Sequence, residues 1–596
     1  MRRIFVLAFV LSLLAVLSAI NAQTTPKFWQ YAPTPVLGWN SWDIFGTTVT
    51  EKQIKEQADA MAVHLLPSGY KYLTVDIQWY EPESKGHHYK RNAKLTMDEY
   101  GRLTPGLKKF PSAASGKGFK PLADYVHSKG LKFGIHIMRG IPKQAVEKNT
   151  PVLGTNVKAR DIAITSSVCR WNPDMYGVDA TKPEGQAYYN SIIQMYADWG
   201  VDFIKVDDIS RPYDDIQKAE IEAIRKAINE TGRPIVLSLS PGATPVAAGN
   251  HVMKHANQWR ITDDFWDRWV LLLAMFERLD AWTPYRGAGH FPDADMLPIG
   301  IIDFNRPTHF TQNEQYTLMS LWSIARSPLI FGGDMTKLDD FTKQMLTNPE
   351  VLKVNQESTN NRQVSNDGNL IVWAADIPGS EDKYVALFNA QSKGDDIDKK
   401  NATYIGPIMN KNNRSQKIDI SIKGAKQLIL FVTGAGDGFA YDRVAWVDPV
   451  LHGPDGDLKL IDLKWSSATA GSGEPRLNRT ANNRPITIRG KKVEGIGTAA
   501  ESTIIFDLPK GYETFSVTGM VTDSRTTAQM GVMTSKKALK LKDKADISVD
   551  LKQIGLHGKV KVRDLWRHKD IGVFKGYFTQ EINQHGAGLY RISPVK

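Results

Sequence analysis

The sequence predicts an α/β protein made of a (β/α)8 TIM barrel and a C-terminal β-sandwich, with a further β-sandwich module inserted in the latter. Three observations support this prediction. Short apolar runs alternate with amphipathic helical stretches from about residue 33 to residue 333. Charged residues directly follow several of these apolar runs. After about residue 349, helical periodicity gives way to closely spaced strand patterns.

The first 22 residues have the pattern of a secretory signal peptide. Arg2 and Arg3 precede an apolar run over residues 4–20, and small or polar residues lead to a cleavage site after Ala22. We therefore expect a secreted or periplasmic protein without a membrane span. Cys169 is the single cysteine, so no intrachain disulfide is possible, and we expect it to be inert near a pocket rim.

The composition is that of a globular protein, with 42% hydrophobic residues and 15 tryptophans. The net charge is +11, but the lysines are scattered in pairs such as Lys491 and Lys492 and form no dense stripe. This distribution argues against a nucleic-acid partner. Abundant tryptophan instead suits a carbohydrate partner, because the apolar faces of sugar rings stack on aromatic planes.

Eight apolar runs are expected to form the barrel strands, and helical stretches such as 51–66, 121–130 and 186–200 lie between them. The expected strands are 36–42, 70–79, 131–138, 201–208, 234–240, 257–264, a segment near 280–285, and 327–334. In a barrel of this kind, functional residues gather at the C-terminal ends of the strands.

Two of the expected strands end in a pair of carboxylates. Within the stretch VDFIKVDDIS, the apolar run contains Lys205 and leads to Asp207 and Asp208, and WRITDD contains Arg260 and ends in Asp263 and Asp264. Two acidic strand ends in one chain indicate a paired-carboxylate site, as acid–base or nucleophilic chemistry requires.

The strands after the barrel define the remaining domains. We expect the catalytic barrel to span residues 26–347 and the C-terminal β-sandwich to comprise 348–398 and 542–596. The Gly-, Asn- and Lys-rich stretch 399–541 has strands of its own and is expected to form the inserted module.

Five dispersed motifs give the chain a specific resemblance. TPVLGWNSWDIF, FIKVDD, WRITDD, DADML and LWSIARSPLIFGGD occur in the order, and at about the spacing, of glycoside hydrolase family 27, the α-galactosidase family. GAGDGFAYDRVAWVDPVL and GIGTAAESTIIFDLP resemble the sugar-binding NPCBM domain. The resemblance implies a retaining exo-glycosidase that acts on oligo- or polysaccharides.

The resemblance also implies residue roles. Asp207 matches the nucleophile and Asp264 the general acid/base, which family spacing selects over Asp263 because it lies four residues after Arg260. Such a reaction needs one carboxylate under the anomeric carbon and another near the leaving oxygen. Lys205, on the same strand face as Asp207, is expected to favour the anion. The remaining matches to the sugar pocket are Trp42, Asp76, Lys205, Arg260 and Asp295.

Three departures from the family pattern concern specificity. Ile77 follows Asp76 where galactose-cleaving members have a second aspartate, and an apolar residue there implies a preference for β-L-arabinopyranosides, which lack the C6 group. Alternatively, Ile77 packs behind Asp76, and His136 or Gln78 receives the 6-hydroxyl. His136 stands where many members have tyrosine. Ser240 belongs to SLSPGA, which replaces a Cys-Glu-Trp run near the 2-hydroxyl and leaves room for a bulkier 2-substituent.

Two carboxylates suffice for this reaction, so we expect no cofactor and no metal, and the histidines show no metal-ligand spacing. Two alternatives remain open at this point: a plain α-D-galactosidase, and a non-catalytic carbohydrate-binding protein on an enzyme-like scaffold. The sequence does not indicate the oligomeric state or the natural polysaccharide.

Overall fold

The computed structural model describes residues 25–391, 399–435, 442–471, 473–537, 539 and 543–595. The expected signal peptide, residues 1–22, lies outside the described residues. The chain forms two compact units, which are treated separately below: one comprises 1–267, 275–309 and 321–361, and the other 268–274, 310–320 and 362–596. Within the described ranges, no helix combines the length and the apolar character needed to cross a membrane.

The first unit is built on eight parallel strands in the order β10-β9-β8-β7-β3-β2-β1-β13. An isolated parallel bridge between Leu297, just after β10, and Phe331 of β13 joins the two ends of this sheet. The predicted TIM-barrel class is thereby confirmed. The strands are β1 (Leu37–Asn40), β2 (Tyr72–Val75), β3 (Lys132–Met138), β7 (Phe203–Asp207), β8 (Val236–Leu239), β9 (Gln258–Arg260), β10 (Phe291–Asp293) and β13 (Leu329–Phe331).

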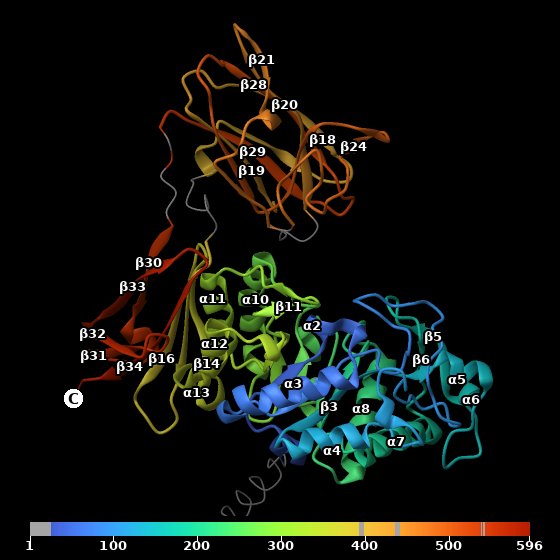
Figure 1. Cartoon of the computed structure of the whole chain (residues 1–596). Coiled ribbons are helices and arrows are strands. Elements are labelled where there is room, and N and C mark those ends of the chain that lie inside the picture. Colours follow the sequence, from blue (N-terminus) through green and yellow to red (C-terminus); the bar gives the residue numbers. More distant parts are fainter. Residues whose placement is uncertain are drawn as a thin grey trace, which may run out of the picture. The chain divides into compact units, whose positions relative to one another are not determined.

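Amphipathic helices alternate with these strands along the chain (Figure 1). α8 buries Ile221, Ile224 and Ile228, whose three- and four-residue spacing places them on one face. α3 begins at a capping box formed by Thr50 and Gln53. The main helices are α3 (Glu51–His64), α4 (Lys120–Ser128), α7 (Pro183–Asp198), α8 (Asp215–Thr231), α9 (Gly249–His255), α10 (Trp269–Ala281), α11 (Gln312–Ile324), α12 (Asp340–Thr347) and α13 (Pro349–Glu357).

Smaller elements lie mainly in the connections between strands and helices. Between β3 and α7, a short three-stranded sheet is formed in the order β4-β6-β5. The short helices are α2 (Trp42–Phe45), α5 (Lys143–Lys148) and α6 (Ala159–Ile162), and the short strands are β4 (Ile141–Pro142), β5 (Ala163–Val168), β6 (Met175–Val178), β11 (Ile301–Ile302) and β12 (Arg306–Pro307).

One of the eight predicted strands is wrong. The segment near 280–285 forms the end of α10 and a 3₁₀ turn, Thr283–Tyr285. The seventh barrel strand is instead β10, which is three residues long and begins at Phe291. The DAWTPY segment carries aromatic and apolar residues typical of a strand, but it continues the apolar pattern of α10, whereas β10 is too short to show strand alternation.

The C-terminal part of the chain forms an eight-stranded sheet in the order β14-β15-β16-β34-β31-β32-β33-β30. Its buried core takes residues from two separate parts of the chain, including Val385 and Leu387 from the first and Val562 and Tyr590 from the second. β16 pairs antiparallel with β34, so strands about 200 residues apart in sequence are neighbours. The strands are β14 (Thr359–Asp367), β15 (Leu370–Asp376), β16 (Lys383–Asn389), β30 (Lys544–Asp550), β31 (Lys559–Asp564), β32 (Lys569–Lys575), β33 (Tyr577–Asn583) and β34 (Ala587–Pro594).

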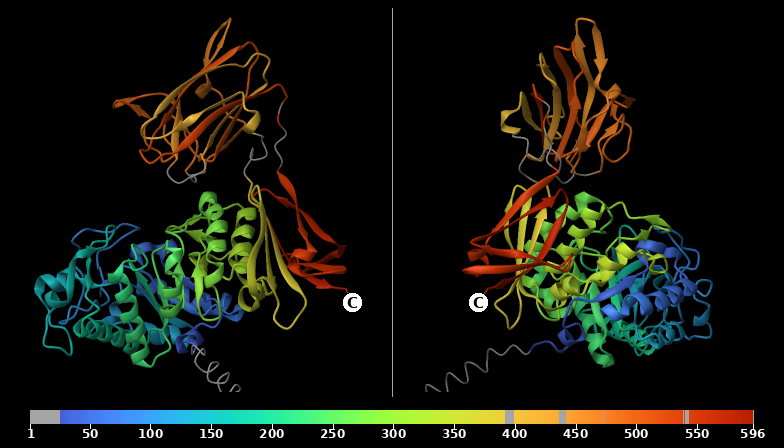
Figure 2. Two further views of the ribbon diagram at one scale, coloured as in Figure 1. Left: turned by 180° about the vertical axis from the view of Figure 1, so that it is seen from behind. Right: turned by 60° about the vertical axis from the view of Figure 1, so that its left-hand side comes forward.

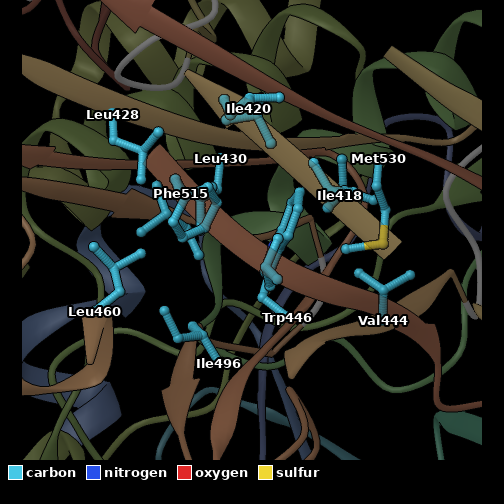
Figure 3. Packing of buried hydrophobic residues seen from close by; sticks show 14 of the residues in the cluster. Ile418, Ile420, Leu428, Leu430, Val444, Trp446, Leu460, Ile496, Phe515 and Met530 are labelled. Carbon is cyan, nitrogen blue, oxygen red and sulfur yellow. The ribbon is translucent and has the colours of Figure 1, made fainter. Parts of the chain in front are cut away.

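Apart from two short 3₁₀ turns, the regular elements that the structure describes between β16 and β30 are strands, drawn mainly in orange in Figure 2. Two sheets, β17-β29-β19-β27-β22 and β18-β28-β20-β26-β23, supply one shared core around Trp446 (Figure 3). A β-sandwich is therefore inserted in sequence within another β-domain. Its main strands are β17 (Tyr404–Met409), β18 (Ser415–Ser421), β19 (Gln427–Thr433), β20 (Arg443–Gly453), β22 (Ser467–Thr469), β23 (Arg476–Leu477), β26 (Gly495–Ala499), β27 (Ser502–Asp507), β28 (Thr514–Val521) and β29 (Ala528–Ser535).

Candidate active site

A cavity of about 430 Å³ opens where the barrel strands end. Its wall is made largely of residues at or just beyond the C-terminal ends of β1, β2, β7, β8, β9 and β10, where this fold places its functional groups. The lining residues are Trp42, Asp43, Asp76, His87, Tyr89, His136, Trp171, Lys205, Asp207, Arg211, Ser240, Pro241, Arg260, Asp263, Asp264, Phe265, Trp266, Asp295 and Met296.

Nine of the ten predicted site residues lie in this wall, and Ile77 does not. Ile77 is 1% exposed, and its backbone N–H donates to Asp76 at 2.9 Å. Gln78, an alternative receiver of the 6-hydroxyl, is also absent from the wall and donates instead to Asp174 at 2.7 Å. Cys169 is buried and is likewise not a lining residue. Burial raises the pKa of the Cys169 thiol, which keeps it in the unreactive form.

Asp207 ends β7 and is 5% exposed. One of its oxygens accepts the backbone N–H of Asp208 at 2.9 Å. The other lies 3.1 Å from Nε2 of His136 on the neighbouring strand β3. The carboxylate is thus held in one orientation at the cavity wall, as a nucleophile requires.

Asp76 is the most heavily paired carboxylate of the site. Asn40 donates to it at 2.8 Å, Lys205 at 3.2 Å, and Nδ1 of His136 lies 2.7 Å away. Burial acts to raise the pKa of Asp76, but the charges of His136 and Lys205 outweigh this effect and hold the pKa well below its usual range. Asp76 is therefore a fixed anion that can accept hydrogen bonds from a ligand.

His136 connects Asp76 with Asp207. The distances are those of ion pairs, although the ring N–H directions do not meet hydrogen-bond geometry. Burial and the charge of Lys205 lower the pKa of His136, but the charges of Asp76 and Asp207 outweigh them and raise it above its ordinary value. The imidazolium form is therefore favoured between the two carboxylates.

This arrangement predicts a pH-dependent contribution of His136 to stability. A raised pKa means that the contribution is complete below the unfolded-state pKa of about 6.5 and is lost as pH rises through the folded-state value. We expect His136→Gln to lower the free energy of unfolding by about 3 kcal/mol at pH 6 and by less at pH 9. Urea unfolding of both proteins at each pH checks this, and a loss that is equal or larger at pH 9 contradicts it.

Arg260 organises the opposite side of the cavity. It donates to Asp264 at 3.1 Å and lies 3.1 Å from Asp295, which also accepts the backbone N–H of Phe265. Burial acts to lower the pKa of Arg260, but Asp295 and Asp264 raise it, so the guanidinium stays charged. The side chain of Asp264 is 58% exposed and therefore reaches both the cavity and solvent.

Asp263 also lines the cavity, but its side chain is 64% exposed and pairs with Arg211 at 2.8 Å. The two neighbouring aspartates therefore have different cation partners. Only Asp264 shares its arginine with the buried carboxylate Asp295.

Asp43 was not predicted as a site residue. It is 3% exposed, lines the cavity, and one of its oxygens has no hydrogen-bond partner among the described residues. Burial, aided by the charge of Asp295, raises the pKa of Asp43 well above its usual range, so its protonated form can donate to a ligand. The one sequence feature that pointed to Asp43 was its position directly after Trp42, which was predicted as a site residue.

Besides the predicted Trp42, aromatic residues from loops surround the cavity, and these were also missed. Trp42 stacks on Tyr89 with ring centroids 6.0 Å apart, and Tyr89 packs against Trp171 at 5.0 Å. His87 contacts both Trp42 and Trp266 edge-on. Aromatic walls of this kind suit the apolar face of a sugar ring. Their loops carry no strand-end signal, so only the tryptophan-rich composition indicated them.

Together these groups can perform acid–base and nucleophilic chemistry on a polar, neutral ligand. Two carboxylates, Asp207 and Asp264, line one cavity, while Asp76, Lys205 and Arg260 provide fixed acceptors and donors for hydroxyl groups.

Models of known protein families match most of the chain. Residues 34–181 and 174–357 match the family described as alpha galactosidase A. Residues 394–452 and 456–554 match the NPCBM/NEW2 domain, and 536–592 match the alpha galactosidase C-terminal beta sandwich domain.

Among curated proteins, an alpha-galactosidase of Oryza sativa subsp. japonica is 30% identical over 365 residues, which are 60% of this chain and 72% of that protein. An alpha-galactosidase of Cyamopsis tetragonoloba is 31% identical over 365 residues, with 60% and 73% covered. Both relatives are named for hydrolysis of α-galactosides.

Two solved structures cover nearly the whole chain. A family 27 β-L-arabinopyranosidase of Geobacillus stearothermophilus, in complex with arabinose, is 37% identical with a TM-score of 0.69, covering 96% of this chain and 99% of that one. A Bacillus halodurans C-125 protein described as a candidate α-N-acetylgalactosaminidase is 34% identical with a TM-score of 0.63, covering 94% and 97%.

The family match over more than half of the chain agrees with the barrel, the cavity and the order of the motifs. The chain therefore belongs to glycoside hydrolase family 27, the α-galactosidase family, and is a glycoside hydrolase that acts on O-glycosyl bonds.

Proposed function

We propose that this chain is a secreted, retaining exo-glycosidase that removes terminal sugars of the α-D-galactopyranosyl configuration by double displacement and favours β-L-arabinopyranosides. The observation that carries the proposal is that Asp207 and Asp264 line one cavity with Asp76, Lys205 and Arg260. We propose secretion because Arg2 and Arg3 are followed by an apolar run, which is the pattern of a signal peptide.

In the first step, a carboxylate oxygen of Asp207 attacks the anomeric carbon, and the bond to the leaving oxygen breaks as Asp264 gives that oxygen its proton. In the second step, Asp264 takes a proton from water, which attacks the same carbon and releases Asp207. The buried position of Asp207 suits attack at the floor of the cavity, and the exposed position of Asp264 suits exchange with the leaving group and with water.

Lys205, Arg260 and Asp76 hold the sugar hydroxyls. Lys205 is buried, and although burial acts to lower its pKa, the charge of Asp76 raises it, so the ammonium remains a donor. Because Lys205 is already paired with Asp76, and Arg260 with Asp295, these groups keep their positions when a neutral sugar enters.

The preference for arabinopyranosides rests on two observations. Ile77 offers no hydrogen bond beside Asp76, and the Gln78 amide donates to Asp174 away from the cavity wall. Of the residues 76–78 at this strand end, Asp76 alone lines the cavity and can bind a hydroxyl there. The similar Geobacillus stearothermophilus structures, 37% and 38% identical, are β-L-arabinopyranosidases. Leaving a buried hydroxyl without a partner costs about 1–3 kcal/mol.

Ile77→Asp is expected to raise the ratio of kcat/KM for α-D-galactosides over β-L-arabinopyranosides at least about tenfold. The new carboxylate supplies an acceptor for the 6-hydroxyl and removes apolar volume, while Asp207 and Asp264 stay in place. Kinetics with the two nitrophenyl glycosides measure the ratio.

The matched control for this prediction is Ile77→Val, which keeps the site apolar and is expected to leave the ratio nearly unchanged. Ile77→Asn repeats the test without a buried charge. Equal ratios in the wild type, Ile77→Asp and Ile77→Asn show that Ile77 only packs behind Asp76.

A plain α-D-galactosidase is the second candidate, favoured by the names of the plant relatives that are 30% and 31% identical. A non-catalytic sugar-binding protein needs neither carboxylate, and the presence of both in one cavity argues against it. We also propose the domain division 26–347, 348–398 with 542–596, and 399–541, with the inserted module binding carbohydrate, as its NPCBM match supports.

A further inference from the structure

Helices α8 and α9 carry a cluster of three metal-ligand side chains that is separate from the active-site cavity. Glu222 lies on α8, and His251 and His255 lie on α9. One ligand atom from each side chain lies within 4.8 Å of the others. None of the three residues lines the cavity at the strand ends.

The two histidines are four residues apart on one helix, so they share a face. Their ring centroids are 4.4 Å apart. The sequence-based expectation that no histidines have metal-ligand spacing is therefore wrong for this pair. It was missed because Glu222, the third member, lies about 30 residues earlier on another helix.

The second nitrogen of each ring is already engaged. His255 Nδ1 lies 2.8 Å from the backbone carbonyl of His251, an acceptor, so this nitrogen carries the proton and donates. The lone pair of His255 then lies on Nε2. His251 Nδ1 lies 2.8 Å from the Tyr213 hydroxyl, and its Nε2 lies 3.0 Å from Glu222.

This is the pattern in which metal-binding histidines are oriented, with one nitrogen donating to a protein oxygen and the other facing the ion. Binding through His251 Nε2 requires the proton to sit on Nδ1, with the Tyr213 hydroxyl turned so that its oxygen accepts.

One carboxylate and two cationic side chains lie in or beside the cluster. Arg225 directs its Nε to the carbonyl of His255 at 2.8 Å. Lys254, between the histidines, is exposed. Glu222 therefore supplies the negative charge that a divalent ion needs.

We propose that Glu222, His251 and His255 form a binding site for a divalent transition metal ion of the zinc class. Two imidazoles and one carboxylate are a ligand set that zinc accepts, with water in the fourth position. Ligand atoms around tetrahedral zinc are about 3.3 Å apart, and the 57% exposed side chain of Glu222 can rotate to close the set. The bound ion would link helix α8 to helix α9 through its ligands.

Zinc titration by calorimetry tests this site on the full-length mature protein, purified without a polyhistidine tag and dialysed against a chelator. We expect one equivalent of Zn²⁺ to bind, and the melting temperature to rise by about 2 °C or more at saturating Zn²⁺. Magnesium is expected to bind much more weakly, because it prefers oxygen ligands.

His255→Ala and Glu222→Gln are each expected to weaken zinc binding at least tenfold, and His557→Ala, which removes an exposed histidine elsewhere, is expected to leave it unchanged. Glu222 is exposed, so its variant tests the site even if His255→Ala fails to fold. Absence of stoichiometric binding, or equal binding by both cluster variants and the wild type, overturns the proposal. Hydrolysis of sugars plays no part in this test, so its outcome is independent of the proposed glycosidase function.

Discussion

Asp207→Asn is expected to lower kcat at least about 10³-fold on every glycoside, with the fold unchanged. The amide has nearly the shape of the carboxylate and can still accept the backbone N–H of Asp208, but it cannot attack the anomeric carbon. The substitution also removes the negative charge from one of the two carboxylates beside His136, but this change does not supply another nucleophile. Steady-state kinetics on an aryl glycoside measure the loss, and circular dichroism checks the fold.

The matched control is Asp208→Asn at the next position. Asp208 pairs with Arg139 and does not line the cavity. Burial raises its pKa to about 6, so an uncharged side chain is tolerated there, and we expect only a small effect on kcat. Similar losses in both variants would mean that Asp207 acts through the local structure and is not the nucleophile.

Asp264→Ala is expected to lower kcat/KM at least about 10²-fold on substrates with poor leaving groups and far less on nitrophenyl glycosides, because only the former need the proton. Azide provides a second measurement. It should accelerate turnover of nitrophenyl glycosides by this variant and give a glycosyl azide of the same anomeric configuration as the substrate, since azide attacks the covalent intermediate.

Asp263→Ala is the matched control for the acid/base role, because the two aspartates are neighbours and both line the cavity. Asp263 is paired with Arg211, so its loss should affect both classes of substrate equally and weakly. If Asp264→Ala reduces activity on both classes to the same degree, Asp264 is not the acid.

The sequence was sufficient to predict the barrel because seven of its strands appear as apolar runs between helical stretches, and several of these runs end in charged residues, as in VDFIKVDD. It failed at β10, whose three residues Phe291–Asp293 are too few for a period of two to appear. The C-terminal sheet was recognisable from strand patterns. The inserted module, however, separates β16 from β34 in the sequence, so no local pattern indicates that these two strands pair.

Within the site, residues on strands were predictable and residues on loops were not. Lys205 and Asp207 lie on one strand at a spacing of two, so they share a face. Tyr89 and Trp171 reach Trp42 from separate loops, and their meeting depends on loop conformation that no local pattern encodes. The role of His136 was only partly predictable. Its place was marked by a departure from the family, but its contacts with Asp76 and Asp207 come from the registers of β3 against β2 and against β7.

Kinetics of the purified wild-type enzyme measure its substrate preference directly. We expect kcat/KM for nitrophenyl β-L-arabinopyranoside to exceed that for nitrophenyl α-D-galactopyranoside, with nitrophenyl α-N-acetylgalactosaminide, a probe of the space near Ser240, as a third substrate. A clear preference for the α-D-galactopyranoside contradicts the arabinopyranosidase proposal and identifies a plain α-galactosidase, while a preference for the N-acetylated sugar contradicts both.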